Sequence, residues 1–146
     1  MKTIIVSGSV GSGKTTISKK LVKSLKSDYI NITEFVKKNK IGKYNKKYNS
    51  YEVDIKKLNT KLIKIIKEHK KLNKNLIIDG HLSHFLPRKY VDLGIICKCD
   101  IKKLKKRLEK RKYSKNKIRE NLDVEIFDIP LIEARKKKHK IKIINT

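Results

Sequence analysis

The sequence predicts a three-layer α/β fold in which a five-stranded parallel sheet is flanked by helices. Short apolar runs rich in β-branched residues alternate with segments whose apolar residues recur at helical spacing. A glycine-rich loop connects the first run to the first helical segment. Because 146 residues suffice to bury one core, we expect a single domain over residues 1–146.

Five short apolar runs predict the strands. These runs are Thr3–Ser7, Tyr29–Asn31, Leu76–Asp79, Leu93–Cys97 and Ile141–Ile144. Helical segments separate them, which favours parallel strands joined by crossover helices. Ligands of such sheets bind at the carboxyl ends of the strands, so the residues that follow each run are the candidates for a site.

The segments between the runs predict the helices. They extend over Thr16–Lys26, from a Thr33 cap to about Lys38, onward from the cap Asp54, from Ile101, and from Ser114. In the last of these, five residues are expected to face inward, with a kink at Pro130: Ile118, Leu122, Ile126, Ile129 and Ile132. The polar stretch 40–50 is expected to be a loop.

The net charge of +26 arises from 40 Lys and Arg against 14 Asp and Glu. A polyanionic partner such as RNA would account for this excess. A lysine-rich coding bias that produces a solvated surface accounts for it equally well. Eleven Lys or Arg and one acid occupy residues 102–119, and this local concentration favours a binding face there.

The sequence also predicts where the protein resides. No apolar run is long enough to cross a membrane, and the first strand begins directly after Met1-Lys2, so we expect no membrane association and no signal peptide. Cys97 and Cys99 lie one residue apart on one predicted strand and cannot form a disulfide framework. A reducing, cytoplasmic location is therefore expected.

The glycine-rich loop Gly8–Thr15 fits the pattern G-x-x-x-x-G-K-[ST] between a strand and a helix. Backbone N–H groups of such a loop and the positive end of the following helix surround a polyphosphate. Lys14 is expected to reach the β- and γ-phosphates of a purine nucleoside triphosphate, and the Thr15 hydroxyl to bind Mg²⁺. A simple connecting turn is the alternative.

Asp79 ends an apolar strand, where an acidic residue holds Mg²⁺ through water opposite the loop threonine. A strand-end cap is the alternative. His81 and His84 form an H-x-x-H pattern, but the sequence places no further ligands beside them, so we reject a zinc site. His81 is a candidate for orienting water or a phosphate, with a structural role as the alternative.

Arg107 and Arg111 lie one helical turn apart, ahead of a short polar stretch. Planar guanidinium groups bind phosphates and stabilise the charge that develops in phosphoryl transfer. Only five of the forty cationic residues are Arg, so two of them at this spacing favour a phosphate-binding role.

Taken together, these motifs resemble the adenylate kinase isoenzyme 6 family of archaea and eukaryotes over nearly the whole chain. The matching segments are Gly8–Thr16, Tyr29–Ile32, Tyr51–Asp54, the D-x-H motif Ile78–His81, Phe85–Tyr90, Leu108–Ser114 and Glu120–Ala134. The D-x-H motif and the E-I-F motif of Glu125–Phe127 are the specific elements, because the phosphate loop alone would not select a family.

The resemblance implies a P-loop nucleoside triphosphatase fold with a monophosphate-binding segment at 31–53 and a short lid at 112–121. It implies a broad nucleoside monophosphate kinase that converts ATP and AMP, or another monophosphate, into two diphosphates, with Mg²⁺-dependent ATPase activity. It further implies a role in late small-subunit rRNA maturation. In that role the protein would bind a small-subunit ribosomal protein, and rRNA as well, and ATP hydrolysis would release the ribosomal protein.

The resemblance also implies roles for single residues. The residues implied to bind ATP are Gly11, Gly13, Lys14, Thr15, Thr16 and the lid residue Arg111. The residues implied to act in catalysis are Lys14, Asp79, His81 and Arg111. Thr15 and Asp79 are implied to hold Mg²⁺, partly through water.

Several positions depart from the family pattern. Asn45, Gly80 and Lys112 replace an Asp, an aromatic residue and a Gly, and Lys56 and Lys57 replace an acidic pair. The family has a base-binding loop and a final helix past the last residue of this sequence, so we expect phosphate binding to be better specified than base selectivity. Two alternatives remain: an ATP-switched ribosome assembly factor with weak kinase activity, and another small P-loop kinase with a shikimate-like substrate.

Overall fold

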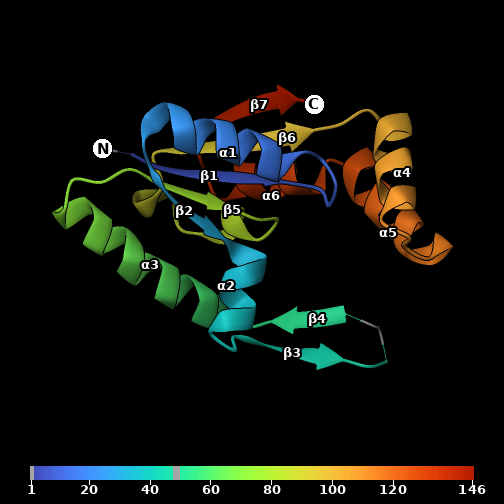
Figure 1. Ribbon diagram of the computed structural model, residues 1–146, viewed down its shortest axis with the longest axis horizontal. Coiled ribbons are helices and arrows are strands. Elements are labelled where there is room, and N and C mark those ends of the chain that lie inside the picture. The colour runs from blue at the N-terminus through green and yellow to red at the C-terminus, as the bar shows by residue number, and fades with distance from the viewer. Residues whose placement is uncertain (1, 48–49) are drawn as a thin grey trace.

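The computed structural model describes residues 2–47 and 50–146 (Figure 1). Its main sheet has five parallel strands in the order β2-β5-β1-β6-β7. The strands are β1 (Thr3–Gly8), β2 (Asp28–Asn31), β5 (Leu76–Asp79), β6 (Leu93–Lys98) and β7 (Ile141–Asn145). The predicted five-stranded parallel sheet is therefore confirmed.

Six helices and two short 3₁₀ turns complete the part of the chain that the structure describes. They are α1 (Lys14–Leu25), α2 (Ile32–Lys38), α3 (Ile55–Lys71), η1 (Ser83–Phe85), η2 (Arg88–Tyr90), α4 (Ile101–Lys110), α5 (Lys115–Ile126) and α6 (Ile129–Lys136). Within the described ranges, no helix combines the length and apolar character that crossing a bilayer requires.

The sheet is covered on both faces because its strands are apolar on both sides. Side chains of a strand alternate between faces, so Ile4 and Val6 pack against α1 while Ile5 packs against α2 and α3. Helix α6 covers Ile96 of β6 with Leu131 and Ala134. Helices α4 and α5 extend away from the sheet, and their apolar residues form a small cluster with Cys99 and Val10 (Figure 1).

The stretch 40–50 contains a hairpin rather than a loop, which corrects the prediction. Strand β3 (Gly42–Asn45) pairs antiparallel with β4 (Ser50–Val53), so that Asn45 lies opposite Ser50. Residues 48 and 49 of the predicted loop lie outside the described residues. The lysine-rich composition of this stretch obscured its Tyr residues and the Val53 that follows it, although both residue types favour extended backbone.

The helix expected from Ser114 is two helices, which corrects a second prediction. The helix is interrupted at Asp128, which adopts a left-handed conformation with φ of 53°. Pro130 belongs to the first turn of α6 and does not kink a continuous helix. The break lets α6 bury Pro130 together with Leu131 and Ala134. As a result the predicted inward residues Ile126, Ile129 and Ile132 are 54%, 39% and 45% exposed.

The helix caps agree with the sequence except at α2. Asp54 and Ser114 accept backbone hydrogen bonds at the starts of α3 and α5, as predicted. Thr33 does not cap α2; instead Asn31, at the end of β2, accepts from the Glu34 N–H at 3.1 Å. Thr33 thereby faces the cavity described below.

Candidate functional site

The phosphate loop joins β1 to α1 at the carboxyl edge of the sheet. A Cβ at Gly8 would lie 2.7 Å from the carbonyl oxygen of Cys97 on β6, so the close approach of these strands requires glycine. Gly13 adopts φ of 93° at the N-cap of α1. This left-handed turn aims the first backbone N–H groups of the helix at the space above the loop.

Lys14 lies along the loop that precedes it. Its Nζ donates hydrogen bonds to the carbonyl oxygens of Gly8 at 3.1 Å and of Ser9 at 2.8 Å. Desolvation lowers the pKa of Lys14 to about 8, an effect that the Asp79 carboxylate partly offsets. A cation held at low hydration beside the helix N-terminus is poised to bind an anion more strongly than a solvated lysine does.

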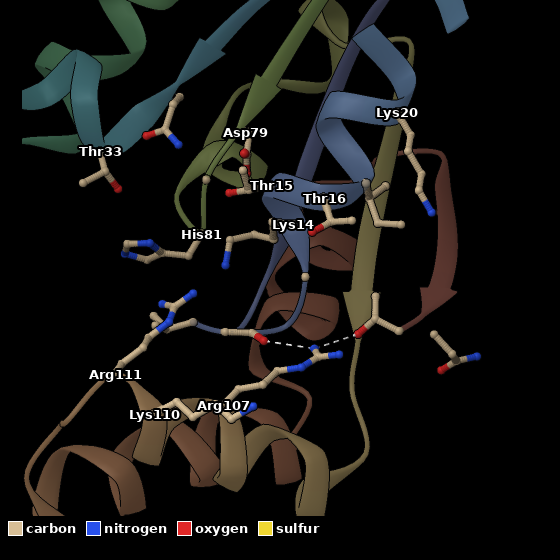
Figure 2. A pocket seen from close by; sticks show the side chains of 18 of the residues that line it. Lys14, Thr15, Thr16, Lys20, Thr33, Asp79, His81, Arg107, Lys110 and Arg111 are labelled. Atoms are coloured by element: carbon tan, nitrogen blue, oxygen red, sulfur yellow. Dashed lines mark hydrogen bonds between the residues drawn. The ribbon is translucent and has the colours of Figure 1, made fainter. Parts of the chain in front are cut away.

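A cavity of about 900 Å³ opens above the loop (Figure 2). All the residues that the sequence named for the site line it: Gly11, Gly13, Lys14, Thr15, Thr16, Asp79, His81 and Arg111. They come from three separate segments of the chain: the phosphate loop with the start of α1, the end of β5, and the end of α4. Lys20, Arg107 and Lys110 also line the cavity, so its walls are strongly cationic.

Asp79 is almost completely buried at the end of β5. The Tyr29 hydroxyl, on the neighbouring strand β2, donates a hydrogen bond of 2.6 Å to its Oδ2. Desolvation and this hydrogen bond raise the pKa of Tyr29 to about 12, so the phenol stays protonated and keeps donating. Tyr29 therefore fixes the orientation of the carboxylate.

Thr15 and Asp79 supply oxygen donors of the kind that Mg²⁺ prefers, and both line the cavity. Among the described residues, no group of three or more His, Cys, Asp or Glu side chains is arranged to hold a metal. These residues fit a Mg²⁺ ion that takes its remaining ligands from phosphate oxygens and water.

His81 and His84 occupy different surroundings despite their H-x-x-H spacing. His81 is exposed to the cavity, where neighbouring protein atoms and the charge of Lys14 lower its pKa below the usual value, so the ring is neutral at pH 7. His84 is buried; its Nδ1 lies 2.7 Å from Ser7 Oγ and its Nε2 lies 3.2 Å from Glu133 Oε1. His84 thus joins α6 to the end of β1.

The preceding Gly80 has a steric role of its own. A Cβ at this position would lie 2.7 Å from Cβ of Ile32, at the start of α2. Glycine therefore allows α2 to pack directly against the turn that presents His81, and a larger residue here would displace one of them.

Comparisons with known proteins place this chain in a family. A model of the family described as "AAA domain" matches residues 4–128. A protein of Methanocaldococcus jannaschii named "Putative adenylate kinase" is 41% identical over 145 residues, which cover 97% of this chain and 77% of the relative. A protein of Pyrococcus furiosus with the same name is 36% identical over 143 residues, which cover 98% of this chain and 74% of the relative.

This chain belongs to the archaeal adenylate kinase family. The resemblance read from the motifs is therefore confirmed at the level of the family. The fold of this family member is also that of solved small-molecule kinases at low sequence identity. A shikimate kinase from Acinetobacter baumannii in complex with shikimate superposes with a TM-score of 0.65 at 14% identity, covering all of this chain and 85% of that one. A sugar kinase from Janibacter superposes with a TM-score of 0.62 at 14% identity, covering 99% of this chain and 85% of that one.

Two contacts of this adenylate kinase family member escaped the sequence analysis. The Arg107 guanidinium donates to the carbonyl oxygen of Gly11 at 3.1 Å and to Thr146 Oγ1 at 3.2 Å, which ties α4 to the phosphate loop. Tyr29 reaches Asp79 only because β2 and β5 are neighbours. Sequence spacing signals neither contact, since each joins segments 39 or more residues apart.

Proposed function

We propose that this protein is a nucleoside monophosphate kinase that transfers the γ-phosphoryl group of ATP to AMP or a related monophosphate, and that also hydrolyses ATP. The carrying observation is that the cationic cavity above the phosphate loop shares two lining residues, Thr33 and His81, with a second pocket of about 220 Å³. A donor site and an acceptor site side by side are what this reaction needs.

The donor side is the phosphate loop with its cations. Gly11, Gly13 and Thr16 would contact ATP phosphates through the loop and the start of α1. Lys14 would contact the β- and γ-phosphates from one side, and Arg111, from the end of α4, would contact them from the other. In Figure 2 these two cationic side chains point into the same space.

The acceptor side is formed by the segment 31–53 and the residues packed against it. The second pocket is lined by apolar side chains of α2, β4 and the start of α3, with Lys37 at its edge. An apolar slot of this kind suits the flat face of a nucleobase, and Lys37 offers a charge to a phosphate or a hydrogen bond to the sugar. Its few polar groups support acceptance of several bases.

The reaction needs no covalent enzyme intermediate. An oxygen of the acceptor phosphate attacks the γ-phosphorus, and the bond to the β-phosphate oxygen breaks, which leaves ADP. Lys14 and Arg111 neutralise the charge on the transferred group, while the neutral ring of His81 can hydrogen-bond the attacking oxygen. Mg²⁺ held by Thr15 and Asp79 would supply further neutralisation at the phosphates.

Hydrolysis follows when water takes the place of the acceptor. The predicted lid, residues 112–121, consists of the turn after α4 and the first half of α5. A lid this short covers little of a cavity of about 900 Å³, so water can reach the γ-phosphate.

The decisive experiment measures ADP formation from ATP with and without AMP, GMP, CMP, UMP and shikimate. We expect phosphorylation of at least one monophosphate, slower hydrolysis with no acceptor, and no reaction of shikimate. Hydrolysis with no phosphorylation of any monophosphate would exclude the kinase and favour an ATP-switched assembly factor. Phosphorylation of shikimate alone would favour the other alternative, a small P-loop kinase with a shikimate-like substrate.

The role of His81 is tested in the same assay. We expect His81→Ala to slow hydrolysis at least as much as transfer, because a positioned acceptor depends less than free water on one hydrogen bond. His84→Ala cannot serve as the control, because His84 is buried. His69→Ala is a suitable control, because the ring of His69 contacts Asp28 away from the cavity. An unchanged ATPase rate in His81→Ala would return His81 to a structural role.

We further propose, from the family resemblance, that the protein takes part in small-subunit rRNA maturation through a ribosomal protein. The supporting observation is that most cations between residues 102 and 119 are exposed, so this face is available to a polyanion. An RNA affinity that falls steeply between about 50 and 200 mM salt is expected for such a face. A flat salt dependence would count against RNA binding.

A further inference from the structure

Helices α4 and α5 and the turn 111–114 between them make up one unit, the arm. The arm forms one wall of the cavity. Its apolar cluster, built around Leu104 and Leu108, also contains Val10 of the phosphate loop, so the arm packs directly on the loop. It carries Arg107, Lys110 and Arg111 into the cavity, from the side opposite β5. The chain enters the arm after β6 and leaves it at the break before α6, so the arm has two attachments.

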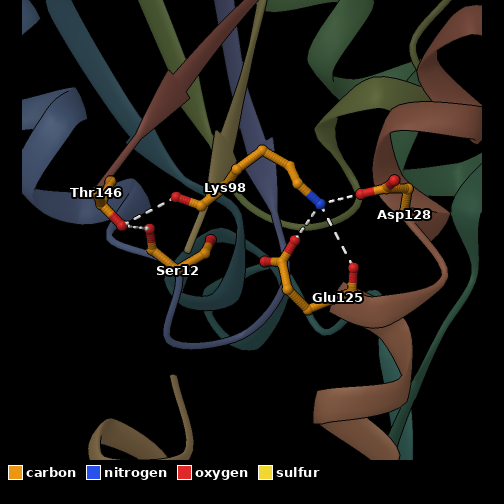
Figure 3. A network of polar contacts seen from close by, with 5 residues as sticks. All are labelled: Ser12, Lys98, Glu125, Asp128 and Thr146. Atoms are coloured by element: carbon orange, nitrogen blue, oxygen red, sulfur yellow. Dashed lines mark hydrogen bonds and ion pairs between the residues drawn. The ribbon is translucent and has the colours of Figure 1, made fainter. Parts of the chain in front are cut away.

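A polar cluster joins these two attachments (Figure 3). Lys98, the last residue of β6, lies at the entry, while Glu125 and Asp128 lie at the exit. The Lys98 ammonium donates to the Glu125 carboxylate and to its backbone oxygen, and it pairs with the Asp128 carboxylate. The Lys98 ammonium is therefore bound by a carboxylate at the end of α5 and by another just before α6.

Because this cluster is partly buried, its charges must compensate one another. Glu125 is 4% exposed, and an ionised carboxylate at such a site is stable only while a cation compensates it. Desolvation lowers the pKa of Lys98, but hydrogen bonds to the two carboxylates outweigh this effect and raise it overall. Asp128 is held in the left-handed conformation, which non-glycine residues adopt at a cost when their surroundings impose it.

The same lysine reaches the phosphate loop through its main chain. The Lys98 carbonyl oxygen accepts the Thr146 N–H at 2.8 Å, and the Thr146 hydroxyl donates to the Ser12 carbonyl oxygen at 2.8 Å. The position of Lys98 is therefore linked on one side to the loop and on the other to the exit of the arm, as Figure 3 shows.

We propose that Lys98, Glu125 and Asp128 form a hinge clamp that sets the position of the arm, and so of Arg107 and Arg111, relative to the phosphate loop. The three are positioning residues, since none of them lines the cavity. The proposal rests on the proposed kinase function, for which the clamp would keep the arginines at the transferred phosphoryl group and limit the access of water.

The test compares four proteins: wild type, Glu125→Gln, Lys98→Met and the double variant. We expect Glu125→Gln to lower kcat for transfer by about tenfold or more, because catalytic groups misplaced by about 1 Å cost up to a hundredfold. Hydrolysis should fall less, so the ratio of hydrolysis to transfer rises. The KM for ATP should change little, since the phosphate loop is intact.

The double variant separates positioning from simple stabilisation. Lys98→Met leaves Glu125 buried without its cation and should lower the melting temperature most, whereas removing both charges should restore much of it. A clamp predicts that the double variant regains stability but not the ratio of transfer to hydrolysis. Recovery of both together would overturn the proposal. Lys98→Arg, which keeps a cation, should stay near wild type in both.

Asp28→Asn is the matched control. It removes a carboxylate that also has a hydrogen-bond partner, the ring of His69, at the opposite end of the sheet. We expect its ratio of hydrolysis to transfer to equal that of wild type. A shift as large as that of Glu125→Gln would show that the ratio responds to the loss of a carboxylate remote from the arm, which would contradict the clamp.

A distance measurement tests the clamp even if the protein transfers no phosphoryl group. Spin labels at Lys19→Cys on α1 and Lys115→Cys on the arm would both be exposed, whereas the native Cys97 and Cys99 are buried. With a non-hydrolysable ATP analogue we expect one narrow distance in the wild type and a broad distribution in Glu125→Gln. Identical distributions would overturn the proposal, while a failure of the monophosphate panel alone would overturn only the kinase.

Discussion

The two walls of the cavity differ in how their geometry is fixed. On the sheet side, every residue of β1 is buried, and Asp79, Ser7 and His84 are held by hydrogen bonds to other buried or half-buried groups. On the arm side, few residues are buried and the cations that enter the cavity sit on a largely exposed pair of helices. Substitutions on the sheet side should disturb folding or chemistry according to how the residue is packed, whereas those at exposed residues of the arm should disturb chemistry alone.

The largest effect is expected from Lys14→Ala on the sheet side. Loss of the cation that contacts the phosphates should lower kcat by about 10³-fold, the range found when a charge-stabilising group is removed. The melting temperature should stay level or rise, because a desolvated amine is removed. Steady-state ADP formation and thermal unfolding measure the two effects, with Lys19→Ala on the exposed face of α1 as control. Activity within tenfold of wild type would contradict the assignment of the phosphate loop.

Arg111→Ala tests the arm side of the comparison. We expect kcat to fall by about 10²-fold, because one guanidinium is lost from the transferred group, with an unchanged melting temperature, because Arg111 is exposed. Lys106→Ala removes an exposed cation of the same helix outside the cavity and should leave kcat within about twofold. A large drop in the melting temperature of Arg111→Ala would show that the arm, too, depends on this residue for folding.

The smallest effect is a pH dependence of stability on the sheet side. Desolvation lowers the pKa of His84 to about 4, against about 6.5 for an unfolded histidine, so below pH 6.5 the unfolded chain binds a proton that the folded chain does not. The free energy of unfolding should therefore fall between pH 6.5 and 4, by on the order of 1–3 kcal/mol. Burial raises the pKa of its partner Glu133, which offsets part of the fall.

Urea unfolding at pH 7 and pH 4.5 measures this dependence. His84→Gln should reduce the difference between the two pH values, although His81 and His139, whose pKa values are also lowered, keep part of it. A difference as large in His84→Gln as in wild type would assign the acid sensitivity to other groups.

The parts of this protein that sequence analysis predicted are those specified by nearby residues. The five strands followed from apolar runs, and the phosphate loop from one continuous motif whose glycines permit its backbone path. Asp79 and His81 followed from their position just after a strand, since parallel strands end at one edge. Their placement in one cavity is the placement expected.

The parts that sequence analysis missed depend on contacts between distant segments. The hairpin β3–β4 was not predicted, because the segment is rich in lysine and lysine content says little about backbone pairing. Ile126, Ile129 and Ile132 fit one helical face in the sequence, yet the turn at Asp128 rotates the two helices and leaves these residues exposed. Helical periodicity assumes one continuous axis; Pro130 indicated a kink, but the left-handed turn at Asp128 that separates two helices was not predicted.

The sequence by itself determined the fold class, the family and the backbone path of the phosphate loop, because a strand, a glycine-rich turn and a helix N-terminus are local structures. Tertiary structure alone decided that Tyr29 orients Asp79, that Arg107 meets Gly11, and that Lys98 joins both attachments of the arm. The physical reason is that a buried charge or hydroxyl takes whatever partner the packing of the sheet brings within reach, and sequence separation does not limit that choice.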